Sequence, residues 1–128
     1  MKRTITTSLA AAALGAIALA PTALASGGDD VRSAGKCSGS STSKIKVKPD
    51  NGRLDVEFEV DQNRNGVKWR VRIKDNGETA FRGKATTRAP SGSFSLERRI
   101  DDLPGSDTIK GIGKNPDSGE RCVAQVKI

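Results

Sequence analysis

The chain has 128 residues, with 22 Lys and Arg against 15 Asp and Glu, a formal net charge of +7, and no histidine or tyrosine. This length fits one small domain, and the positive charge permits anionic partners without requiring them. The lack of histidine excludes Ser–His and Cys–His nucleophile arrangements, so we expect a protein that is not an enzyme.

Residues 1–25 have the pattern of a secretory signal peptide. Lys2 and Arg3 form its basic region, residues 9–20 form its apolar region, and an A-x-A cleavage site ends at Ala25, before Ser26. An apolar run of about twelve residues is shorter than the roughly 20 that a membrane span needs. We therefore predict a secreted, extracellular protein without a transmembrane segment in its mature form. Its net charge would be 20 minus 15, or +5.

Residues 26–43 are rich in glycine and serine, which predicts a flexible lead-in before the folded domain. This segment contains Cys37, and Cys122 is the only other cysteine. In an oxidising compartment the two are expected to form a disulfide bond. Two isolated thiols without a histidine cannot complete a zinc site, so we expect a structural bridge and no cofactor.

The remainder, residues 44–128, contains short strand-like segments separated by turn signals such as Asn76-Gly77. This spacing predicts an all-β antiparallel sandwich or a small barrel, with an up-and-down meander as a further alternative. The seven expected strands are 44–48, Arg53–Asp61, 67–74, 78–89, 93–100, 107–114 and 121–128.

Two adjacent segments, Arg53–Asp61 and residues 67–74, alternate strictly between apolar and charged residues, as half-buried strands do. The first would expose only acids and the second only bases, which predicts one strongly acidic and one strongly basic surface. The acids are Asp55, Glu57, Glu59 and Asp61, and the bases are Lys68, Arg70, Arg72 and Lys74.

Residues 107–128 resemble the last two strands of immunoglobulin-like and fibronectin type III-like modules, and Trp69 fits their core tryptophan. The chain also resembles small exported actinobacterial proteins of unknown function, from Trp69 through Gly83 and Phe94 to the Gly-Glu-Arg-Cys motif at 119–122. The resemblance implies a seven-stranded immunoglobulin-like sandwich and no activity. It also implies that Cys37 and Cys122 join the N-terminal segment to the last strand.

Two topologies are compatible with the charged segments. In a direct hairpin, acids and bases would pair across the strands, Asp61 with Lys68 and Glu59 with Arg70 for example, and would mainly fix the register. In an immunoglobulin-like sandwich the two strands lie in opposite sheets, and the bases gather on one outer face. That candidate anion-binding face comprises Lys68, Arg70, Arg72, Lys74, Lys110, Lys114, Arg121 and Lys127.

The candidate partners of such a face are an anionic cell-wall polymer, another anionic surface or an acidic protein. We expect the protein itself to be a monomer. No motif for sequence-specific nucleic-acid recognition is present. The aromatic residues, which could otherwise stack on bases, all fall on the apolar side of their strands. The expected core comprises Phe58, Trp69, Val71, Phe81, Phe94 and Ile109.

Three weaker patterns have simpler explanations. Asp61, Asn63 and Asn65 match the start of a calcium loop, but Arg72 occupies the position of its bidentate glutamate, so a polar turn is expected. Glu57 and Glu59 share one exposed strand face and lack the distinct environments of a catalytic pair. Residues 88–92, from Arg88 to Gly92, could form the loop of a protein-interaction or protease-inhibitor module, which is the alternative function; a Pro-Ser-Gly turn between two strands explains the segment more simply.

Overall fold

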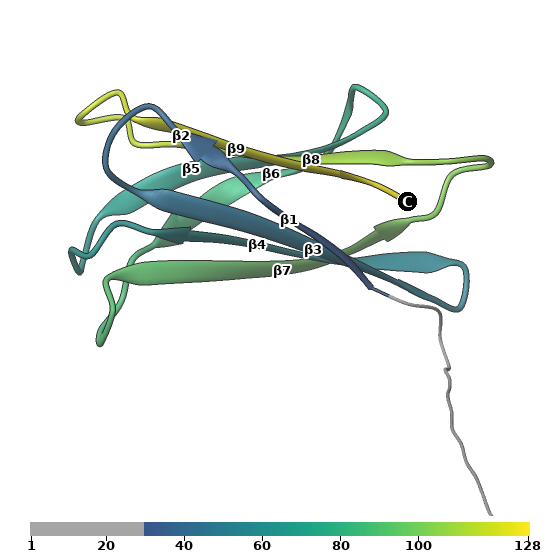
Figure 1. The fold of residues 1–128 in the computed structure, drawn as a ribbon, viewed down its shortest axis with the longest axis horizontal. Helices are drawn as coiled ribbons and strands as arrows, with labels where there is room; N and C mark the ends of the chain where they lie inside the picture. Colours follow the sequence, from purple (N-terminus) through teal and green to yellow (C-terminus); the bar gives the residue numbers. More distant parts are fainter. Residues whose placement is uncertain (1–29) are drawn as a thin grey trace, which may run out of the picture.

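Two antiparallel β-sheets pack face to face in the structure, a computed structural model that describes residues 30–128 (Figure 1). The first sheet has the order β1-β3-β4-β7, with bounds Val31–Ala34, Thr42–Asp50, Arg53–Asp61 and Ser93–Asp101. The second sheet has the order β2-β9-β8-β5-β6, with bounds Lys36–Cys37, Arg121–Lys127, Thr108–Lys114, Lys68–Asp75 and Glu78–Thr86. The described residues include no helix long and apolar enough to cross a membrane.

The alternation in the sequence produces the core directly, because one side of each strand is apolar and turns inward. Phe58 and Trp69 are fully buried, and both rings lie 6.2 Å from that of Phe94. Val71 and Ile109 are buried as expected. Phe81 differs: it packs against the core only partly buried, with the guanidinium of Arg98 4.4 Å from its ring centre.

The predicted all-β sandwich is confirmed, with nine strands where seven were expected. The two charged segments belong to different sheets: β4 pairs with β3 and β7, and β5 pairs with β6 and β8. The direct hairpin and its cross-strand pairs therefore do not form, and neither does the meander. The strand expected at 78–89 ends earlier, at Thr86.

The flexible lead-in predicted for residues 26–43 is wrong where the structure describes it. Residues 31–34 form β1, which pairs with β3 from Val31↔Val47 to Ala34↔Lys44, and β2 pairs with β9. The chain changes sheets at Gly35 (Figure 1), where a Cβ would lie 2.3 Å from the Ser43 Oγ. A glycine that suggests a linker in the sequence is thus required by close packing.

The expected disulfide is present and joins directly opposed residues of β2 and β9, Cys37 and Cys122, whose Cα atoms are 4.0 Å apart. It therefore connects the N-terminal segment to the last strand. The expected signal peptide and its cleavage site lie outside the described residues.

Candidate binding face

The outer surface of the second sheet collects the bases expected to bind anions. Trp69, Val71 and Ile73 of β5 point into the core, so the residues between them must point to solvent. The register of the sheet places cations of β6, β8 and β9 on the same side. We call this surface the basic face; its cations are Lys36 of β2 together with Lys68, Arg70, Arg72, Lys74, Arg82, Lys84, Lys110, Lys114, Arg121 and Lys127.

All eight predicted cations lie on the basic face, and three further ones were missed: Lys36 of β2, which stands opposite Val123 of β9, and Arg82 and Lys84 of β6. Arg82 stands directly opposite Arg72, and Lys84 opposite Arg70. The sequence signal for these two was the alternation Arg82-Gly83-Lys84, which is weak because a glycine stands where an inward apolar side chain is expected. Gly83 has no room for one, since a Cβ there would lie 2.5 Å from the Phe81 ring.

Like charges face one another across the strands of the basic face. Arg70 lies between Lys84 of β6 and Lys114 of β8, and Lys114 in turn opposes Arg121 of β9. Neighbouring strands are about 4.8 Å apart, so these four cations repel one another. Among residues 30–128, none of the ion pairs involves a cation of the basic face. The repulsion is not relieved within the described chain.

An open groove of about 700 Å³ runs over the basic face. Its floor includes Ile112, which is only 8 % exposed although it points outward, because long basic side chains around it cover it with their aliphatic parts. The groove thus combines a narrow apolar floor with cationic walls. The residues of its walls are Arg70, Arg72, Arg82, Lys84, Lys114 and Arg121.

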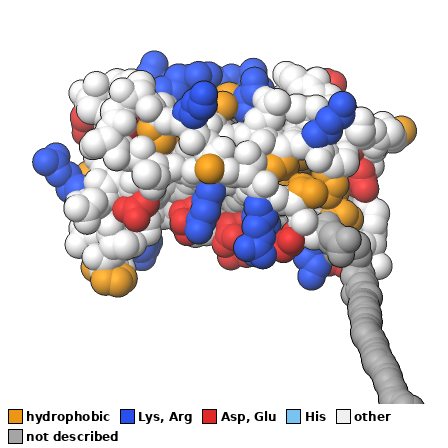
Figure 2. All heavy atoms as spheres, in the orientation of Figure 1, with side chains coloured by type: hydrophobic (Ala, Val, Ile, Leu, Met, Phe, Trp, Pro, Cys, Tyr) orange, Lys and Arg blue, Asp and Glu red, His pale blue; other side chains and the backbone are white. Residues whose placement is uncertain are grey.

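The predicted acidic surface is wrong. Figure 2 shows blue side chains along the upper rim, above the second sheet, whereas red and blue side chains alternate below, along the first. Lys44 lies 3.3 Å from Glu59, Lys46 lies 3.5 Å from Glu57, and these bases come from β3. Glu57 and Glu59 of β4 are therefore neutralised by β3, a strand whose lysines were not predicted to pair with them.

Arg99 neutralises the same strand from the other side. From β7 its guanidinium donates hydrogen bonds to Asp55, at 2.9 Å, and to Asp50, at 3.0 Å. These two carboxylates raise the pKa of Arg99, first through the hydrogen bond with Asp55 and then through the charges of both. The first sheet presents a mixed surface, so within residues 30–128 the basic surface is that of the second sheet.

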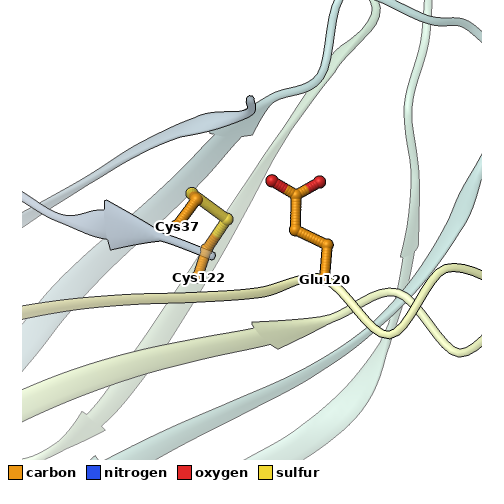
Figure 3. Close-up of side chains that lie close together, drawn as sticks. All are labelled: Cys37, Glu120 and Cys122. Carbon is orange, nitrogen blue, oxygen red and sulfur yellow. A yellow bond between two sulfur atoms is a disulfide. The ribbon is translucent and has the colours of Figure 1, made fainter. Parts of the chain in front are cut away.

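Three possible metal ligands lie close together on β2, on β9 and directly before β9: Cys37, Cys122 and Glu120 (Figure 3). The two sulfur atoms are bonded to each other and are not thiolates. The carboxylate of Glu120 accepts hydrogen bonds from the Gly39 amide (3.1 Å), the Ser41 amide (3.0 Å) and the Ser41 hydroxyl (2.8 Å). The group fixes the loop between β2 and β3.

The calcium-like motif forms a turn. Asp61 ends β4, and its carboxylate accepts a hydrogen bond from the Asn63 amide at 3.0 Å, while Asn63 has a φ of 60°. This is an Asx turn, for which asparagine and aspartate are preferred. The turn accounts for the motif without a cation.

The loop from Arg88 to Gly92 is tight and braced. Arg88 and Ser93 form a bridge, and the Gly92 amide donates to the Arg88 carbonyl at 2.9 Å. The Gln62 amide donates to the Gly92 carbonyl at 3.0 Å, so the loop is held against the β4–β5 connection. No contact within the described residues favours the inhibitor alternative, which stays a prediction.

One end of the sandwich contains a buried acidic pair, Asp75 and Asp107, which are 4 % and 1 % exposed. The pKa of Asp75 is raised to about 7. Burial is the largest cause, a hydrogen bond with Asp107 is the second, and the negative charges of Asp107, Asp102 and Glu78 add to them. The pKa of Asp102 is also raised, first by desolvation. Asp75 ends β5 with its side chain turned inward, so the pair is separate from the basic face.

Comparison with known proteins gave no match to a protein-family model, a curated protein or a solved structure.

Proposed function

We propose that the protein is an exported, non-enzymatic binding module that holds an anionic extracellular polymer on its basic face. The observation that carries this proposal is the set of cations on one sheet surface without a single neutralising carboxylate in the described chain. Assembling like charges on adjacent strands costs stability, and a bound polyanion would remove that cost. On the first sheet, by contrast, acidic and basic side chains of neighbouring strands form ion pairs.

The disulfide supports an extracellular site of action, because such bonds persist in oxidising compartments. It also fixes β2 against β9 at the edge of the second sheet, so the basic face is formed before the ligand binds. A preformed face loses little conformational entropy on binding.

The proposal is tested by affinity for an immobilised polyanion, such as heparin or a phosphate-rich wall polymer, over a series of salt concentrations. Binding through several cations predicts that log K falls linearly with log[salt], with a slope of about −0.7 per contact for a single-stranded polyanion. The variant R70E/R72E should lose most of the affinity and show a shallower slope.

The matched control is R32E/K48E, which changes the net charge by the same amount on exposed positions of the first sheet. It should bind like the natural chain, since only total charge and not the basic face is altered. If both variants lose the same affinity, net charge alone explains the binding, and the assignment of the site to the basic face is refuted.

A further inference from the structure

The four cations of β5 form a regular row along the basic face. Lys68, Arg70, Arg72 and Lys74 occupy alternate positions of one strand, and the pairing of β5 with β8 is regular from Arg70 onward. Alternate residues of a strand are about 6.6–6.8 Å apart. The row therefore presents positive charge at a constant interval over its four levels.

Neighbouring strands add cations at the same levels, because paired residues of adjacent strands lie side by side. The level of Arg70 is the most charged, with Lys114 on one side and Lys84 on the other. Arg72 is joined by Arg82, and Lys74 by Lys110. Three of the four levels thus hold more than one cation.

The interval of the row has a chemical counterpart. Two residues of a strand comprise six backbone bonds, and a phosphodiester chain with three carbons between phosphates also has six bonds from one phosphorus to the next. Extended chains of equal bond number have similar lengths, about 7 Å here. A polymer with five carbons between phosphates has eight bonds, so its charges fall out of step with the row after a few repeats.

The rings needed to read nucleobases are turned away from this surface. Single-stranded nucleic acid is normally bound by stacking its bases on exposed aromatic side chains. Phe58, Trp69 and Phe94 are buried in the core, and Arg98 lies over the ring of Phe81. The groove offers Ile112 and aliphatic stems as its floor. A plain phosphodiester chain without bases suits these walls and this floor.

Resting on the proposed function, we propose that the ligand is a linear phosphodiester polymer of the poly(1,3-glycerol phosphate) type. It lies parallel to β5, with one phosphate at each level of the row. Its backbone passes along the groove, between the cations of β6 and those of β8.

A length series tests the repeat. Binding of synthetic 1,3-glycerol phosphate oligomers with two to eight phosphates is measured by calorimetry at low salt, using the disulfide-bonded protein. Affinity should rise steeply up to four or five phosphates and then only slightly, and the salt slope should level off near −3, which is four contacts at about −0.7 each. A 1,5-ribitol phosphate oligomer of equal charge should bind roughly three- to tenfold more weakly, as expected for one or two lost charge contacts.

Two DNA ligands separate backbone from base recognition: an abasic oligonucleotide and an oligothymidylate of equal length. Both have the six-bond repeat, so equal affinity supports the proposal. Tighter binding of the thymidylate by tenfold or more would show base recognition and overturn it.

Single substitutions locate the ligand on the face. Arg72→Ala removes a cation of the row, and Lys48→Ala removes an exposed cation of β3 on the first sheet. We expect a clear loss of affinity for the first variant and little change for the second, because Lys48 lies on the other sheet, outside the basic face. If all polyanions bind alike, without a plateau in length, this inference fails while the proposed function stands. If none binds, both fail.

Discussion

Asp75 is the residue whose ionisation should control the stability of the domain most directly. Its pKa is raised to about 7 in the folded protein, from 3.8 for the exposed group. A raised pKa contributes stability that is fully present below pH 3.8 and is lost as the pH rises through about 7. The side chains that face it are Asp107, Asp102 and Glu78, all of which disfavour its charged form.

We therefore expect the free energy of unfolding to fall between pH 5 and pH 8.5, and Asp75→Asn to remove much of that fall. At pH 8.5 the variant should be more stable than the natural chain, since the amide carries no charge beside Asp107. Urea unfolding at both pH values measures this. Asp117→Asn, on the exposed turn before β9, is the control and should keep the natural pH dependence. A variant that loses stability equally at both pH values would contradict the assignment.

Gly111 shows how closely the two sheets approach. A Cβ at this position of β8 would lie 2.4 Å from a ring carbon of Phe58, whereas at Gly113 the nearest atom, in the Trp69 ring, would be 3.3 Å away. Overpacking of a filled core costs about 1–3 kcal/mol. We expect Gly111→Ala to destabilise the domain by that amount and Gly113→Ala by less, as measured by thermal or denaturant unfolding. The reverse order would show that the packing of Phe58 is misplaced.

At the scale of the strands, the disulfide closes a long loop and should account for much of the stability. The bond joins residues 85 positions apart. The chain-entropy model gives roughly 4.5 kcal/mol for such a loop, and removal of a native disulfide from a small secreted domain typically costs about 2–5 kcal/mol. The variant C37A/C122A should unfold at a correspondingly lower urea concentration. A reducing agent should destabilise the natural chain similarly and leave the variant unchanged.

The strands themselves were largely predictable. Arg53–Asp61 matches β4 residue for residue, because strict alternation and a turn signal at each end determine both faces and both limits. The strands β1 and β2 were not predictable by the same means. Val31–Ala34 is short and lies among glycines and serines, and it becomes a strand only through its pairing with β3 and the disulfide that follows. Tertiary contacts there override local composition.

The site was predictable in part, and the limit has a physical cause. Alternation on β5 showed which of its residues point outward, but the charge of a surface depends on which strands lie beside each other. The pairing of Asp55 with Arg99 joins positions 44 apart, and no local pattern encodes it. The pairing of Glu59 with Lys44 follows from the hairpin across Asn51-Gly52, a turn signal that was recognised without drawing the charge pairing from it. For that reason the outward direction of the β5 cations was predicted, whereas their neighbours Arg82 and Lys84 and the pairing of the β4 acids were not.

At the scale of the whole molecule, uncompensated repulsion predicts an unusual response to salt. Screening by added salt should relieve the repulsion among the cations of the second sheet and raise the melting temperature from its low-salt value. The variant R70E/R72E places acids beside Lys84 and Arg82, so it should be more stable than the natural chain at low salt and gain less from added salt. Melting curves across a sodium chloride series measure both effects. A natural chain that loses stability as salt is added would contradict this interpretation.

The contrast between the two sheets has a geometric consequence. A flat body that is cationic on one side and balanced on the other settles on a charged support in a single orientation. Its second sheet would lie against the polymer, and the mixed surface of its first sheet would become the new exterior. A coat of such molecules would hide the negative charge beneath it and display ion pairs in its place, altering how the covered surface attracts other proteins.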